Sequence, residues 1–167
     1  YHILHPNDHV NTSQSTNDVY PTALRLATYT RLDELLHVQK SLIDTLYSKA
    51  SEFQYVIKMG RTQLQDAVPM TMEQEFRAFA TLLKEDFKLI EQMRQLLLEV
   101  NLGATAIGTG VNTPDGYAKH AVQTLTKITG LPLKGAEDYV EATSDCGVFI
   151  ILSSSLKRSE ERRVGKE

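Results

Sequence analysis

The sequence predicts an all-α protein built as a long-helix bundle. Two long stretches of the chain contain neither Pro nor Gly, and in both of them apolar residues recur every three, four or seven positions. This spacing places the apolar side chains on one face of a helix. No segment shows the alternation that is typical of a strand, and hydrophobic residues make up 41% of the 167 residues, which is enough for a core.

The first predicted helix covers residues 22–57, and Pro21 directly before it favours a helix start. At about 1.5 Å per residue, this helix would be roughly 50 Å long. A second long helix is predicted over residues 71–101. The connector between them holds Gly60 and Pro69, which exclude a continuous helix. The apolar stripe of the first helix consists of Leu32, Leu35, Leu42, Leu46, Ala50, Phe53 and Ile57.

The two long helices form a hairpin whose apolar faces require partner helices from other subunits or from sequence outside this chain. Residues 103–110 are rich in Gly, Ala and Thr and are predicted to pack closely without regular structure. A shorter helix is predicted over residues 117–128, closed by Gly130 and Pro132. A last helix is predicted to begin around residue 138 or 141 and to carry residues 146–156.

The charge balance excludes two classes of partner. The chain has 18 Lys and Arg against 21 Asp and Glu, for a net charge of −3, so it offers no basic surface for nucleic acid or for an anionic membrane. No apolar run is long enough to cross a bilayer. Cys146 is the only cysteine, which excludes an intrachain disulfide, favours a cytoplasmic location and indicates a packed small residue, not a nucleophile.

The most informative stretch, residues 5–18, holds two His, three Asn, two Asp, two Ser and two Thr just before the first helix. Short hydroxyl and amide side chains ahead of a helix N-terminus form a donor-rich pocket that suits a small dianion such as a dicarboxylate. The alternative is an ordinary polar loop, since helix capping uses the same residue types. His5 and His9 lie four apart without a third ligand, so no metal site is expected.

Four segments carry a resemblance to a known family. His5-Pro6-Asn7-Asp8-His9-Val10-Asn11 with Ser13-Gln14-Ser15-Thr16-Asn17-Asp18 resembles the signature of the fumarase/aspartase superfamily of homotetrameric lyases. Gly60-Arg61-Thr62-Gln63-Leu64-Gln65-Asp66-Ala67-Val68-Pro69 is similar to its second characteristic region. Residues 99–110 and 141–147 also match. The resemblance covers about residues 1–157.

Two positions favour the aspartase branch of the superfamily. Fumarases usually carry Ser where this chain has Thr16 and His where it has Gln63; some aspartases keep that His, so Gln63 argues mainly against fumarase. The resemblance therefore implies a carbon–nitrogen lyase that reversibly deaminates L-aspartate to fumarate and ammonia. The alternatives are a fumarate hydratase, or a non-catalytic helical protein related to lens crystallins. Glu73 departs from the family, which usually has Gly there.

The resemblance also assigns roles to residues. Ser15 and Thr16 match donors to the substrate carboxylate that gains charge, and Asn17 matches a contact to the leaving amine. Thr62 and Gln63 match substrate contacts that a neighbouring subunit delivers to an active site shared within a homotetramer. A possible second carboxylate site maps onto His5, Asn7 and Asp8. The reaction implied needs no metal and no cofactor, and the implied substrate is a small dicarboxylate amino acid.

No residue of this chain is predicted to be the catalytic base. The family's base is a serine in a mobile Gly-Ser-Ser-x-Met-Pro loop, and nothing in residues 153–167 resembles that loop. Residues 1–157 are therefore interpreted as a fragment of the family's central helical-bundle domain, inactive alone. Residues 158–167 lose the apolar period and resemble the translation of a sequencing adapter, so they are interpreted as a non-native tail.

Overall fold

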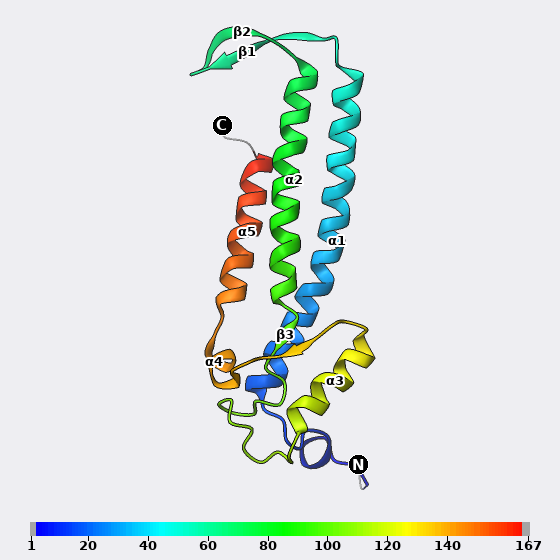
Figure 1. Cartoon of the computed structure of the whole chain (residues 1–167), viewed down its shortest axis with the longest axis vertical. Helices are drawn as coiled ribbons and strands as arrows, with labels where there is room; N and C mark the ends of the chain where they lie inside the picture. The colour runs from blue at the N-terminus through cyan, green and yellow to red at the C-terminus, as the bar shows by residue number, and fades with distance from the viewer. Residues whose placement is uncertain (1–2, 165–167) are drawn as a thin grey trace. The chain divides into compact units, whose positions relative to one another are not determined.

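The computed structural model describes residues 3–164, with the side chains of residues 162–164 excepted. Helices dominate these residues, and the long helices predicted from the apolar spacing are present (Figure 1), which confirms the all-α, long-helix class. By contacts, the chain divides into two compact units, one of residues 3–31 and 93–151 and the other of residues 32–92 and 152–164. Each unit is described by itself. Among the described residues, no helix is both long and apolar enough to cross a membrane.

Helix α1 (Thr16–Glu52) begins six residues earlier than predicted and ends five residues earlier. Ser15 starts it, because the Ser15 Oγ accepts a hydrogen bond from the backbone N–H of Asn17 at 3.2 Å. Pro21 lies inside the helix and does not open it. A proline has no N–H to give to the carbonyl four residues back, and here that carbonyl, of Asn17, accepts from the Asn101 Nδ2 at 3.0 Å instead.

The connector contains strands, so the prediction that the chain has none was wrong. Strands β1 (Ile57–Thr62) and β2 (Gln65–Thr71) pair antiparallel, with an irregularity between Met59 and Arg61. Gln63 and Leu64 form the two-residue tip, with φ of 49° and 64°. Both values lie in the left-handed region that a type I′ hairpin turn needs. Asn and Gly are the usual residues for such a turn, so a Gln-Leu pair gives no sequence signal for it.

In the second unit, α1 from residue 32 onward lies beside α2 (Met72–Leu96) and α5 (Gly147–Val164) (Figure 1). The rings of Phe53 and Phe76 lie 5.5 Å apart between α1 and α2. Leu32 and Ala50 of the predicted stripe are buried, but between them the buried positions lie one residue later, so Leu42 stays 40% exposed while Ile43 is buried. The buried apolar residues of this unit are Leu32, Leu36, Ile43, Ala50, Ala80, Leu83, Ile90 and Leu152.

Helix α2 ends before residue 101 because the chain changes to an extended conformation. Strand β3 (Glu99–Val100) pairs in parallel with β4 (Lys134–Gly135) in the first unit. Helix α3 (Tyr117–Thr129) agrees with its predicted bounds within one residue, and Gly130 closes it with φ of 70° and an N–H bond to the Thr126 carbonyl. The core of this unit contains a cluster of Leu98, Val100, Val122 and Leu133.

The predicted last helix is two helices. Helix α4 (Tyr139–Ser144) is capped by Asp138, whose Oδ1 accepts from the Val140 N–H at 2.8 Å. Asp145 is extended, with φ of −81° and ψ of 131°, and its Oδ1 accepts from the Gly147 N–H at 2.9 Å. One aspartate therefore ends α4 and caps α5, which apolar spacing alone does not reveal.

Helix α5 continues through residues 158–164, where the sequence predicts a non-native tail. The Ser159 Oγ accepts from the Gln39 Nε2 at 2.9 Å, and the Arg158 Nε lies 3.0 Å from the Asp86 Oδ1. The origin of this segment stays a prediction, as does the boundary at residue 157. Its last three residues, 165–167, lie outside the described residues.

Candidate active site

The first part of the site is the N-terminus of α1, in the first unit. Ser15 is half-buried, whereas the side chains of Thr16 and Asn17 are exposed. Ser15 and Asp18 both cap the helix start, because the Asp18 Oδ1 accepts from the Ser15 N–H at 2.9 Å while the Ser15 Oγ accepts from the Asn17 N–H at 3.2 Å. An open pocket of about 380 Å³ lies at this helix start. It is lined by Asn11, Gln14, Ser15, Thr16, Val19, Tyr20 and Ala23.

This geometry leaves hydrogen-bond donors free for a ligand. The Ser15 Oγ uses a lone pair for the cap, so its O–H proton remains available to donate. The Thr16 Oγ1 has no hydrogen-bond partner among the described residues. A pocket of this size is within the range of small-molecule sites, and the helix N-terminus favours negative charge. The arrangement can therefore bind one carboxylate group of a small acid.

Asp18 is the residue that sequence reasoning missed. It is quoted in the motif but is given no role there, and it proves to be fully buried, with 0% exposed. Its Oδ2 accepts from the Gly103 N–H at 3.1 Å and from the Thr105 N–H at 3.0 Å. With the Ser15 N–H, three backbone donors satisfy this carboxylate without a cation. The Ser-x-x-Asp spacing is the signal that could have identified the cap, but not the contacts to residues 103 and 105.

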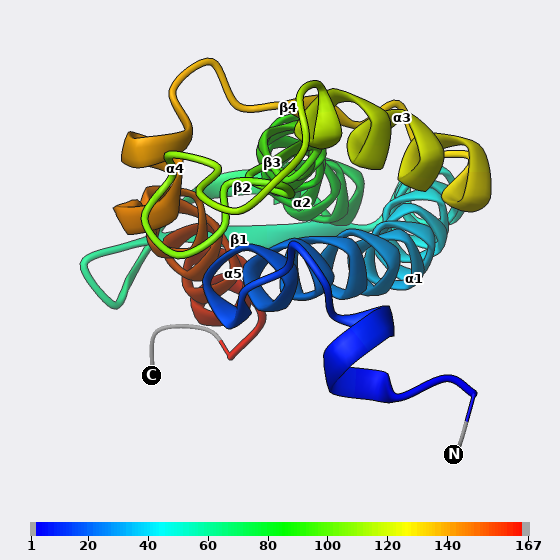
Figure 2. The ribbon, with the colours of Figure 1, turned by 90° about the horizontal axis from the view of Figure 1, so that it is seen from below.

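The segment that joins β3 to α3 passes close to the start of α1 (Figure 2). The Ala106 carbonyl accepts a hydrogen bond from the Asn17 Nδ2 at 2.7 Å. Buried Asn101 donates from its Nδ2 to the Asn17 carbonyl and to the Thr143 Oγ1, at 3.0 and 3.3 Å. Both the side chain and the backbone of Asn17 are thus held by this segment.

Burial raises the pKa of the Tyr117 phenol, and the carboxylate of Asp18 raises it further. Both effects disfavour the phenolate, since one removes water and the other adds a like charge. Tyr117 therefore stays neutral beside Asp18 at physiological pH.

The predicted second carboxylate site lies at the start of the short π-helix η1 (Pro6–Val10), which His5 caps, and all three of its residues are exposed. The structure brings His5 and Asp8 together, with 3.2 Å between the His5 Nδ1 and the Asp8 Oδ2. The same nitrogen lies 3.3 Å from the Asp8 N–H and can accept from it only when the ring is neutral there. Asn7 lies apart from this pair, because its Oδ1 accepts from the Asn11 Nδ2 at 3.4 Å.

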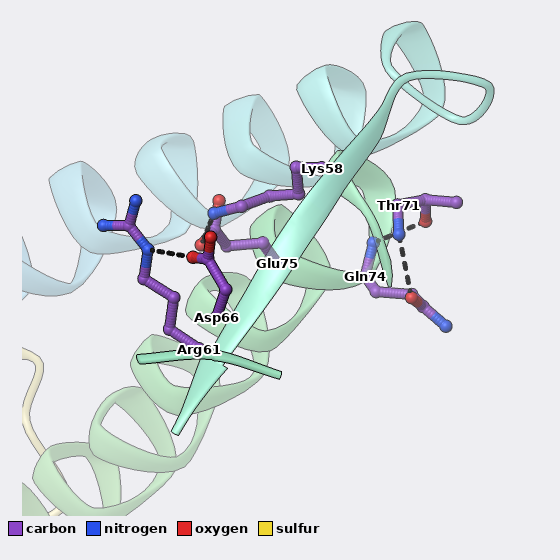
Figure 3. A network of polar contacts seen from close by, with 6 residues as sticks. All are labelled: Lys58, Arg61, Asp66, Thr71, Gln74 and Glu75. Carbon is purple, nitrogen blue, oxygen red and sulfur yellow. Dashed lines mark hydrogen bonds and ion pairs between the residues drawn. The ribbon is translucent and has the colours of Figure 1, made fainter. Parts of the chain in front are cut away.

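Thr62 and Gln63 lie in the second unit, at the tip of the β1–β2 hairpin, and both are exposed. Ion pairs order the strands below the tip: Arg61 pairs with Asp66 at 3.2 Å, and Lys58 pairs with Glu75 of α2 (Figure 3). Leu64 beside them is 100% exposed. The side chains at the tip are thus presented on an ordered hairpin.

The start of α2 is also ordered. Thr71 and Gln74 form a reciprocal cap of 3.0 and 3.3 Å, drawn in Figure 3. Glu73, the departure from the family pattern, pairs with Arg77 at 2.6 Å on the helix surface. The charge at position 73 is therefore compensated locally.

Comparisons with known proteins identify the family. A family model described as "Lyase" matches residues 2–160. The aspartate ammonia-lyase of Escherichia coli K12 is 58% identical over 158 residues, which are 95% of this chain and 33% of the relative. The aspartate ammonia-lyase of Corynebacterium glutamicum is 55% identical over 159 residues, 95% of this chain and 30% of the relative. The chain thus spans about a third of the length of these curated relatives.

Solved structures agree with the sequence comparison. A fumarate lyase:delta crystallin from Brucella melitensis bound to cobalt superposes with a TM-score of 0.87 at 50% identity, covering 95% of this chain and 34% of that one. A class II fumarase from Schistosoma mansoni superposes with a TM-score of 0.85 at 32% identity, covering 94% and 36%. Because the family model matches nearly the whole sequence, the chain belongs to the lyase family, within the fumarate lyase superfamily.

Proposed function

We propose that the full-length protein is an aspartate ammonia-lyase, which reversibly converts L-aspartate to fumarate and ammonia. The observation that carries this proposal is the 55–58% identity to aspartate ammonia-lyases over 95% of the chain. Thr16 and Gln63 support the same branch. The reaction removes a proton and ammonia without a redox step, so it requires no redox cofactor.

The residues at the start of α1 suit this chemistry. A base takes the proton from the carbon beside one carboxylate, and the electron pair left behind spreads into that carboxylate. The pair then forms the carbon–carbon double bond as the carbon–nitrogen bond breaks, and ammonia leaves with the bonding electrons. Hydroxyl donors on Ser15 and Thr16 and the positive end of α1 would stabilise the charge that develops on the carboxylate. The base itself is assigned to the serine loop that these residues lack.

Asn17 suits the leaving amine. Its Nδ2 is occupied by the Ala106 carbonyl at 2.7 Å, which leaves the Oδ1 as the free end of the amide. An oxygen acceptor is the group that an ammonium donor requires. The proposed contact with the amine therefore uses the Asn17 Oδ1, which accepts no hydrogen bond within the described part of the chain.

We further propose a homotetramer in which Thr62 and Gln63 of one subunit serve the Ser15 site of another. Several apolar side chains of the β1–β2 hairpin are exposed in the single chain, Ile57, Leu64 and Val68 among them. They support this proposal, since a group of exposed apolar side chains is typical of a surface that a partner covers. His5, Asn7 and Asp8 are proposed as a second carboxylate site, and the cytoplasm as the location.

The activity is tested by following fumarate absorbance with purified full-length protein. Fumarate formation from L-aspartate, with none from malate, is expected. Malate as the better substrate would favour fumarate hydratase, the function that the class II fumarase relative performs by its name. No turnover of either compound would favour a non-catalytic member of the superfamily.

Subunit sharing is tested by mixing two inactive full-length variants, Ser15→Ala and Thr62→Val. Hybrid tetramers contain some sites with both residues intact, so mixing should restore part of the activity. Co-refolded Ser15→Ala and Thr16→Val, which alter the same half of the site, serve as the control and should stay inactive. The same recovery of activity in both mixtures, or none in either, would show that the site is not shared.

A further inference from the structure

We propose that Asp18 is a positioning residue that fixes the loop of residues 103–106 and, through that loop, the amide of Asn17. This inference rests on the proposed function, because it assigns Asn17 the amine of the substrate. Asp18 itself touches no ligand, since it is fully buried beneath the helix start.

Asp18 divides its two carboxylate oxygens between the helix start and a distant loop. One oxygen accepts from the Ser15 N–H at 2.9 Å and so belongs to the helix cap. The other accepts from the N–H groups of Gly103 and Thr105, at 3.1 and 3.0 Å. The carboxylate therefore joins the helix start to a loop more than eighty residues away along the chain.

The backbone conformation of this loop needs such an anchor. Thr105 has φ of 59°, which is strained for a β-branched residue. Gly103 has φ of 94°, and a Cβ there would lie 2.5 Å from the Cα of Ala118. A loop in this conformation persists only when surrounding bonds over-determine it, and Asp18 supplies two of them.

The same loop orients the amide of Asn17, which is proposed to contact the substrate amine. The Ala106 carbonyl, one residue beyond Thr105, accepts from the Asn17 Nδ2 and so sets which end of the amide faces outward. If the loop moved, the amide could rotate and present N–H groups, which repel an ammonium. Loss of Asp18 is therefore expected to weaken recognition of the amine more than recognition of the carboxylates.

The kinetic test uses Asp18→Asn in the full-length protein, assayed in the direction of ammonia addition to fumarate. An amide has one acceptor oxygen and cannot satisfy both the cap and the loop. The KM for ammonia should rise about tenfold or more, the loss of roughly one hydrogen bond to a charged group, while the KM for fumarate changes less than about threefold. Asp138→Asn, the same change at the exposed cap of α4, should alter neither constant.

A second variant keeps the proposal testable if Asp18→Asn fails to fold. Gly103→Ala leaves Asp18 in place but displaces the loop, because its Cβ would collide with Ala118. It should reproduce the rise in KM for ammonia with little change in KM for fumarate. Equal changes in both constants, or no change in either, would overturn the proposal.

Hydrogen–deuterium exchange tests the anchor without any activity. In Asp18→Asn, peptides covering residues 101–108 should exchange about tenfold faster than in the wild type, with α3 unchanged. Unchanged exchange in residues 101–108 would refute the anchoring role even if the protein proved inactive on aspartate. An inactive wild type would instead refute the proposed function, so the two failures are distinguishable.

Discussion

The sharpest test of the proposed site compares Thr16→Val with Ser15→Ala in the full-length protein. The two hydroxyls are neighbours but differ in their structural role. The Ser15 Oγ accepts from the Asn17 N–H at 3.2 Å, so Ser15 caps α1. The Thr16 Oγ1 is exposed and forms no hydrogen bond within the described part of the chain, so the fold does not depend on it.

The expected magnitudes follow from this difference. Removing one donor to developing charge costs about 2.7–4 kcal/mol of transition-state stabilisation, or roughly 10²–10³ in turnover. Both variants should lose turnover on this scale. Loss of a helix cap costs about 1 kcal/mol of stability. Only Ser15→Ala should show that loss, because valine at position 16 keeps the shape of threonine and breaks no bond of the fold.

Steady-state kinetics on L-aspartate and thermal denaturation measure the two effects separately. Thr16→Val should keep the melting temperature of the wild type within experimental error while its kcat falls. A large fall in melting temperature with near-normal kcat would show that residues 15–18 serve only as a cap and that the substrate-site reasoning is wrong.

Three further outcomes are expected. Residues 1–167 purified alone should release no ammonia from L-aspartate, since they lack the serine loop; measurable release would contradict the assignment of the base to that loop. Because burial and Asp18 raise the pKa of Tyr117, the folded protein holds this proton more tightly than the unfolded chain, so the free energy of unfolding should decrease as the pH rises above about 10. Tyr117→Phe should reduce that decrease in chemical denaturation, and Phe at exposed Tyr55 should not. Asp138→Ala should lower the free energy of unfolding by about 1 kcal/mol through loss of the α4 cap, whereas Asp138→Asn should cost only a few tenths.

The parts of the fold that local chemistry determines were predictable. Helix α3 has an amphipathic face and a closing glycine, and its bounds were right within one residue. The start of α1 was misplaced because Pro21 was interpreted as the signal for a helix that begins at residue 22, although the cap formed by Ser15 and Asp18 lies earlier. The β1–β2 hairpin was missed because its left-handed tip is occupied by Gln63 and Leu64, which have no preference for that conformation.

The site was predictable only as far as the motif extends. Ser15, Thr16 and Asn17 lie together at a helix start, as their spacing indicates. The contacts of Asp18 and Asn17 with residues 103–106 join segments more than eighty residues apart, and no local pattern encodes such pairing. The proposed relation between this site and the hairpin tip depends on contacts between subunits, and no spacing within one sequence encodes such contacts.

The proline within α1 has a consequence for how the proposed active site could be re-engineered. Pro21 leaves the Asn17 carbonyl without its helical donor, and Asn101 takes that place. The attachment of Asn101 thus depends on the main chain at position 17 and not on its side chain. The Asn17 side chain could therefore be exchanged to accept a different leaving group while the hydrogen bond from Asn101 to the main-chain carbonyl at position 17 stays intact. Pro21→Ala would do the opposite. It would restore a backbone N–H that can donate to the Asn17 carbonyl, so the helix would become more regular and this N–H would compete with the Asn101 Nδ2 for the same acceptor.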